Sequence, residues 1–142
     1  RYGGCDMSAP DKIIQTNAGS AGTLDGAPSA ATDGNWCSGY RYATFIAQVT
    51  ADSASDVATF EVWLGYKTNA NTAKPETIVW VKDTRIPGGN YSAIKGTAGD
   101  TAKVDLEIAG ADKVYHRWSA QTDADVRVKA YVKLHNPAVS KY

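Results

Sequence analysis

Few residues in this 142-residue chain have the types and spacing that catalysis needs. His116 and His135 are its two histidines, and neither has a serine or cysteine at a recognisable nucleophile spacing. The G-x-S-x-G motif of serine hydrolases is absent. His116 alternates in phase with Val114 and Trp118, which indicates a half-buried side chain rather than a metal ligand or a base. We therefore expect a protein that is not an enzyme and that uses no cofactor.

The best candidate for a metal site is a pair of aspartates, Asp123 and Asp125, two residues apart in a predicted loop. Clustered carboxylates in the loops of β-sandwiches bind calcium. The full EF-hand loop signature is absent, however, and an aspartate in a turn commonly accepts hydrogen bonds from the neighbouring backbone. We expect that second role, so the sequence predicts no metal site.

Two cysteines, Cys5 and Cys37, lie in an N-terminal third that is rich in glycine, serine, alanine and aspartate. They form no CxxC motif and no Cys/His spacing suited to zinc. A bond between them would close a long loop and stabilise the fold by roughly 3 kcal/mol. Two buried free thiols are the alternative. We expect the disulfide, which is typical of an oxidising, extracellular setting.

The aromatic residues favour contact surfaces over a purely apolar core. Four tryptophans and eight tyrosines stand against two phenylalanines, and tryptophan and tyrosine prefer places with one dry and one wet end. We expect Trp80 and Trp118 in the core and Trp36 packed on the disulfide. Trp63 is out of phase with the inward residues around it, so it faces a second covered surface or a partner.

These side chains must be positioned by strands. Residues 125–134 alternate without a break, with apolar residues on one side. If this segment forms a hairpin with residues 113–119, one basic, tyrosine-bearing outer face forms. It would contain Tyr115, Arg117, Arg127, Lys129, Tyr131 and Lys133. Such a face suits sugars, nucleic-acid strands or an acidic subunit surface. The alternative is a solvated face whose cross-strand charge partners are Lys103, Asp105 and Glu107.

Further alternating segments predict an all-β protein. Residues 41–50 and 57–67 are expected to form a hairpin, residues 77–82 a strand covered on both sides, and residues 101–109 another strand. We predict a single-domain antiparallel β-sandwich or jelly roll with a long irregular N-terminal arm. The arm covers 1–38, the sandwich domain 39–136 and a C-terminal tail 137–142.

Charge and hydropathy narrow the partners. Fifteen basic and fifteen acidic residues give a formal net charge of zero, which argues against non-specific nucleic-acid binding. No run of 18 apolar residues exists, so we expect no membrane span.

Two functions remain as hypotheses. The first is a non-enzymatic structural subunit of an extracellular assembly, either a virion coat or decoration protein at the virion surface or a surface filament. Its partners would be copies of itself or other subunits, and in a filament residues 12–15 could be donated to a neighbour's sheet. The second is a carbohydrate-binding module or lectin that binds glycans, with the candidate aromatic residues Trp36, Tyr40, Tyr42, Trp63 and Tyr131.

Overall fold

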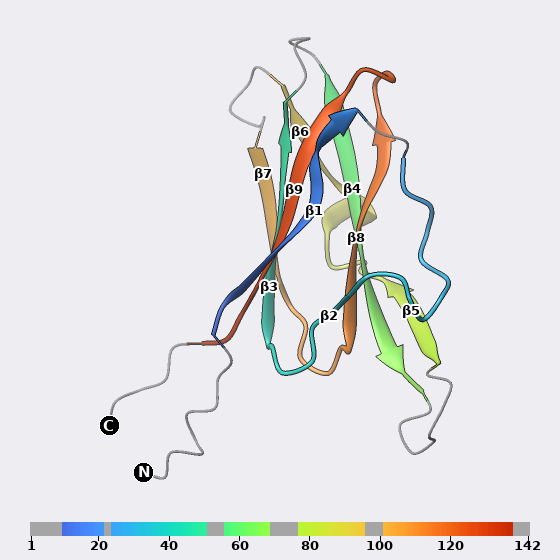
Figure 1. The fold of residues 1–142 in the computed structure, drawn as a ribbon, viewed down its shortest axis with the longest axis vertical. Coiled ribbons are helices and arrows are strands. Elements are labelled where there is room, and N and C mark those ends of the chain that lie inside the picture. The colour runs from blue at the N-terminus through green and yellow to red at the C-terminus, as the bar shows by residue number, and fades with distance from the viewer. Residues whose placement is uncertain (1–9, 22–23, 51–55, 69–76, 96–100, 138–142) are drawn as a thin grey trace.

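The computed structural model describes residues 10–21, 24–50, 56–68, 77–95 and 101–137. Within these residues almost all regular structure is β (Figure 1). The strands are β1 (Lys12–Ala21), β2 (Asn35–Trp36), β3 (Tyr42–Val49), β4 (Val57–Lys67), β5 (Ile78–Lys82), β6 (Tyr91–Ile94), β7 (Thr101–Glu107), β8 (Lys113–Gln121) and β9 (Arg127–His135). A 3-10 turn, Pro87–Gly89, lies between β5 and β6. No helix in the described ranges is long and apolar enough to cross a membrane.

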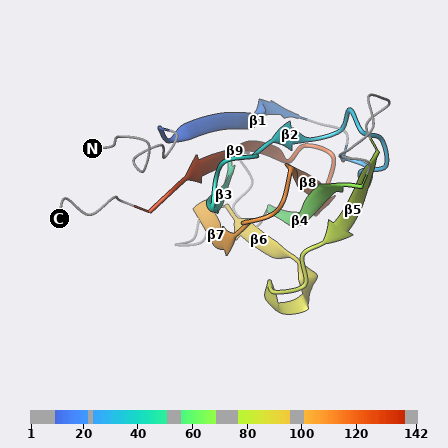
Figure 2. The same cartoon turned by 90° about the horizontal axis from the view of Figure 1, so that it is seen from below.

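The strands form two antiparallel sheets that pack face to face (Figures 1 and 2). Sheet A has the order β1-β9-β3-β7. Sheet B has the order β2-β8-β4-β5, and β6 pairs with the other half of β4. The predicted antiparallel sandwich is confirmed.

The connectivity is that of a jelly roll. β1 pairs with β9, β2 with β8, β3 with β7, and β4 with β5 and β6, all antiparallel. The chain therefore behaves as one long antiparallel ribbon that doubles back after β4 and wraps into two sheets. Consecutive strands of the first half alternate between the sheets as a result.

Alternation of side chains builds the core between the sheets. In β9 the inward residues are each at most 1% exposed: Val128, Ala130, Val132 and Leu134. Their neighbours point outward, as the period of two predicts. Trp118 of β8 is fully buried, which confirms its expected place in the core.

Both predicted hairpins are wrong. Residues 41–50 form β3 in sheet A, whereas 57–67 form β4 in sheet B. Residues 113–119 belong to β8 in sheet B, whereas 125–134 supply β9 in sheet A. The sequence pattern shows which side of a strand is buried, but it does not show which strand lies beside it.

The prediction for residues 77–82 also needs correction. β5 lies at the edge of sheet B, and Val79 and Val81 are 48% and 51% exposed. A run of apolar residues indicated a strand covered on both sides, but here it belongs to an edge strand. Trp80 is half-buried on the outer face of sheet B, 6.0 Å from the ring of Tyr115, rather than in the core.

The N-terminal region is more ordered than the predicted arm. Residues 12–21 form β1, an edge strand on β9 whose register shifts between Gln15 and Asn17. Cys37 is a free, buried thiol whose Sγ lies 3.5 Å from the carbonyl oxygen of Ala111. Cys5 lies outside the described residues, so the structure gives the predicted Cys5–Cys37 bond no support. Residues 138–142 of the predicted tail lie outside the description as well.

Candidate functional site

The outer face of sheet A carries four of the predicted contact residues. Arg127, Lys129, Tyr131 and Lys133 alternate along β9 and point away from the core. In the register of the sheet, Ile13 of β1 lies beside Lys133, and Ile46 of β3 lies beside Tyr131. Ile13 is 67% exposed. Tyr131 and Ile46 therefore lie side by side on the two central strands of this face, whereas Ile13 lies on the edge strand β1.

Charges on this face are balanced at one end only. Lys133 pairs with Asp11, with 3.5 Å between Nζ and Oδ2, and Arg41 pairs with Glu107 at 2.9 Å. At the other end of β9, the side chains of Arg127 and Lys129 have no hydrogen-bond or ion-pair partner among the described residues. Within the part of the chain that the structure describes, this end of the face is therefore basic, with no acidic side chain paired to it.

The outer face of sheet B is covered by residues 24–34, which we call the covering segment. Its backbone carbonyls accept hydrogen bonds from side chains on the sheet: Tyr115 Oη to Gly26 O (3.0 Å), Arg117 Nε to Asp25 O (3.0 Å), Trp80 Nε1 to Ala30 O (3.1 Å) and Lys113 Nζ to Ala31 O (2.8 Å). Asp25 also exchanges two bonds with the backbone of Trp118, both 3.0 Å long. The covering segment has few large apolar side chains, and it is held on sheet B by hydrogen bonds to its backbone.

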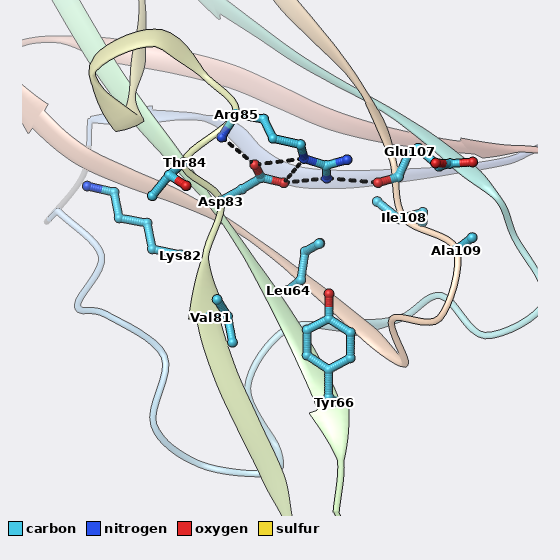
Figure 3. A pocket seen from close by; sticks show the side chains of 10 residues that line it. All are labelled: Leu64, Tyr66, Val81, Lys82, Asp83, Thr84, Arg85, Glu107, Ile108 and Ala109. Carbon is cyan, nitrogen blue, oxygen red and sulfur yellow. Dashed lines mark hydrogen bonds and ion pairs between the residues drawn. The ribbon is translucent and has the colours of Figure 1, made fainter.

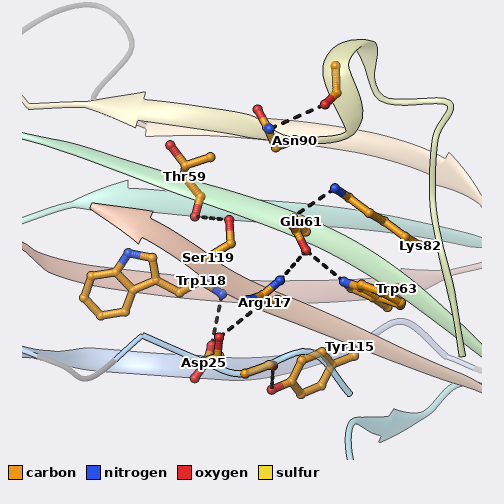
Figure 4. Close-up of polar contacts among 12 residues, drawn as sticks. Asp25, Thr59, Glu61, Trp63, Lys82, Asn90, Tyr115, Arg117, Trp118 and Ser119 are labelled. Atoms are coloured by element: carbon orange, nitrogen blue, oxygen red, sulfur yellow. Dashed lines mark hydrogen bonds and ion pairs between the residues drawn. The ribbon is translucent and has the colours of Figure 1, made fainter. Parts of the chain in front are cut away.

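Glu61 organises the same face (Figure 4). Its carboxylate accepts hydrogen bonds from Trp63 Nε1 at 3.0 Å and Arg117 Nη1 at 2.8 Å, and it pairs with Lys82 Nζ at 3.3 Å. Burial alone would raise the pKa of Glu61, but these three partners together hold the pKa below its ordinary value. Trp63 and Arg117 are therefore engaged within the fold.

The predicted contact set is divided between the two sheets. Arg127, Lys129, Tyr131 and Lys133 stay together on sheet A, whereas Tyr115, Arg117 and Trp63 lie on the opposite side of the molecule. Tyr115 and Arg117 bind the covering segment. The single basic face predicted from the hairpin does not exist, because β8 and β9 lie in different sheets.

His116 lies in the core between the sheets. Nδ1 is 3.2 Å from the hydroxyl of Thr16, the residue at the register shift of β1, and Nε2 is 2.5 Å from the hydroxyl of Tyr91. The ring also stacks on Tyr91 and contacts Phe60. Burial lowers the pKa of His116 to about 3. This histidine is neutral and joins three strands, and it is more deeply buried than the sequence predicted.

Each open side of the sandwich is hollowed. Between β5 and the residues that follow β7 lies a groove of about 300 Å³ (Figure 3). Leu64, Tyr66 and Ile108 contribute to its lining. Asp83 binds Arg85 with both carboxylate oxygens, and Arg85 Nη2 donates to the carbonyl oxygen of Glu107 at 2.8 Å. Arg85, held by Asp83, thus links the two sheets at the groove through its bond to Glu107.

On the other side, a hollow of about 780 Å³ lies between β1 and β2. Lys12, Trp36 and Lys113 contribute to its lining. Trp36 is 44% exposed, and the ammonium groups of Lys113 and Lys67 lie 4.5 and 5.2 Å from its ring centroid. The sequence predicted Trp36 against a disulfide, whereas here it contacts two lysines.

The described ranges contain no group of three histidine, cysteine or acidic side chains that could bind a metal ion. Asp123 Oδ1 accepts a hydrogen bond from the backbone N–H of Asp125 at 2.9 Å, which is the turn role expected for it.

Comparison with protein-family models, curated proteins and solved structures finds no match for this chain.

Proposed function

We propose that this protein is a non-enzymatic structural subunit of an extracellular assembly, a virion coat or decoration protein in the first place and a surface filament subunit in the second. The jelly-roll connectivity supports the proposal, because viral capsid proteins use this architecture, although lectins do so too. The fold alone therefore does not decide between them.

The difference between the two outer faces carries the proposal. The covering segment lies over sheet B, and polar side chains of that sheet donate hydrogen bonds to its backbone carbonyls. On sheet A, the contacts among described residues come from its own strands and from Asp11 and Arg41 at their ends. Ile46 and Tyr131 on the two central strands, with exposed Ile13 on the edge strand, give this face the apolar and aromatic residues that protein interfaces use.

A charge reversal on this face tests the proposal. Lys129→Glu should leave the fold intact, because Lys129 is exposed and substitutions at such surface positions usually change stability by no more than about 0.5 kcal/mol. If the face packs against a neighbouring subunit, the concentration needed for assembly should rise tenfold or more, as sedimentation velocity would show.

The matched control is Lys95→Glu. It changes the net charge equally, but Lys95 directly follows β6 of sheet B. Equal assembly of the wild type and Lys129→Glu would exclude this face as the contact surface.

The hollow at Trp36 favours a second candidate, carbohydrate binding. An exposed tryptophan beside lysines and polar residues resembles a sugar platform in chemistry and in size. Soluble glycans should then change the tryptophan fluorescence of the isolated monomer, and Trp36→Ala should abolish the change. If the protein is only an assembly subunit, the sugars should leave its tryptophan fluorescence unchanged.

A further inference from the structure

β5 differs from the other sheet edges in having little protection against pairing. Natural edge strands are protected by bulges, by short length or by charges. The register of β1 shifts twice, β2 has two residues, β6 has four, and β7 carries exposed charged side chains. β5 pairs with β4 in an unbroken register and has no proline. Figure 2 shows it at the rim of the molecule.

Hydrogen bonds at the two ends of β5 show which backbone groups face outward. The N–H of Thr68 donates to the carbonyl of Thr77 at 3.0 Å, and the N–H of Asp83 donates to the carbonyl of Val62 at 2.8 Å. In an antiparallel ladder, alternate residues direct both backbone groups to the same neighbour. Val79 and Val81 therefore face β4. Ile78, Trp80 and Lys82 direct their N–H and C=O groups away from it, and no described residue bonds to these groups.

These outward residues are symmetric about Trp80. In a second copy placed antiparallel across a two-fold axis at Trp80, the two Trp80 residues face each other and Ile78 faces Lys82. Every opposed residue then presents its backbone groups toward the other copy, so each pair can exchange both bonds. A register shifted by one residue would place an inward-facing residue opposite an outward-facing one and lose this match.

The side chains agree with the same register. Val81 lies beside Leu64 and Val79 beside Tyr66 on β4. Across the two-fold axis, Val79 would lie beside Val81 of the second copy. One apolar row would then run across the contact, from Leu64 and Val81 of one copy to Val79 and Tyr66 of the second. Lys82 adds no unpaired charge to this contact, because its ammonium pairs with Glu61.

We propose that β5 pairs with β5 of a second copy of this chain, antiparallel and in register about Trp80. This inference rests on the proposed function and names one partner and one contact. A five-residue edge provides much less than the roughly 800 Å² per partner of a standard interface. The contact is therefore weak alone and suits an assembly in which several contacts act together.

Lysine substitution tests the edge. Val79→Lys and Val81→Lys place charges on exposed positions and should weaken self-association at least tenfold in sedimentation velocity. Ile94→Lys is the matched control, because it replaces another exposed apolar residue of sheet B, on β6, which pairs with the half of β4 that lies away from β5. Unchanged association of both valine variants would overturn the proposal.

Cross-linking tests the register, in a Cys5→Ser background because Cys37 is buried. A mixture of Val79→Cys and Val81→Cys chains should give a covalent dimer on oxidation, since opposed residues lie about 4.5 to 5.5 Å apart between Cα atoms. Either variant alone should give no covalent dimer, because the same residue in the two copies would lie diagonally across the contact, about 7–8 Å apart. A dimer from one chain alone, or none from the mixture, would overturn the register.

The two proposals fail differently. If the wild type assembles and the valine variants assemble equally well, the β5 contact is wrong and the structural function stands. If the wild type does not associate at any concentration, both are wrong.

Discussion

Replacing His116 should change how stability depends on pH. The pKa of this side chain is about 3 in the folded protein, against an ordinary value of 6.5, because burial disfavours the charged ring. Above pH 6.5 both folded and unfolded chains hold a neutral ring. As pH falls below 6.5, the unfolded chain binds a proton that the folded chain does not, so stability is lost between pH 6.5 and pH 3.

The magnitude follows from this difference in pKa. One pH unit within the window costs about 1.4 kcal/mol, so His116 should remove about 2 kcal/mol of unfolding free energy between pH 7 and pH 5. His116→Phe keeps an aromatic ring among Phe45, Phe60 and Tyr91 but cannot take up the proton. It also leaves the hydroxyls of Thr16 and Tyr91 without this partner, which should cost about 1–3 kcal/mol at pH 7.

Urea unfolding of both proteins at pH 7 and pH 5 provides the assay. Carboxylates that titrate in this range are common to both chains, so their contributions cancel in the difference. The variant should be less stable at pH 7 and should lose about 2 kcal/mol less than the wild type on acidification. An equal loss in the two proteins would refute the buried, neutral state of His116.

Two further substitutions test the outer face of sheet B. Glu61→Gln should cost about 1.5–3 kcal/mol at pH 7, because the carboxylate accepts charge-assisted bonds. The pKa of Glu61 is lowered in the folded protein, so the difference in unfolding free energy between the wild type and the variant should become smaller as pH falls below 4.5. An equally large difference at pH 3 would contradict this. Gly34→Ala should destabilise by more than about 1 kcal/mol, because φ is +71° and the new Cβ would lie 2.5 Å from Val114 O. An unchanged urea midpoint would contradict it.

Alternation predicted the strands well because burial on one side is a local property of the sequence. The inward residues of β9, and Trp63 on the outer side of β4, follow directly from a period of two. The partner of each strand is not local. Tyr115 and Arg127 are close in sequence, yet they lie on opposite outer faces because the ribbon crosses between sheets.

The covering segment shows a second limit. This segment is held on sheet B through the backbone carbonyl groups of residues such as Gly26 and Ala30. Every residue has such a group, so the sequence does not mark them. The donors, Tyr115 and Trp80, were visible in the sequence, but nothing there connected them to a loop some 50 to 90 residues away. Thr16 is similar: the register shift of β1 places its hydroxyl beside His116, and no pattern of residue types signals that shift.

The edge position of β5 does not follow from its own residues. Val79 and Val81 alternate with Trp80 and Lys82, and the apolar run suggested burial on both sides. Lys82 does not mark the exposed side, because its side chain lies on the side opposite Val79 and Val81 and pairs with Glu61 on the neighbouring strand.

The most direct test of the central claim is the size of the purified wild-type protein, measured by light scattering after size exclusion and by negative-stain microscopy. A structural subunit should form uniform particles or filaments many times larger than the 15.1 kDa chain. A monodisperse monomer that persists at high concentration would contradict the proposed function.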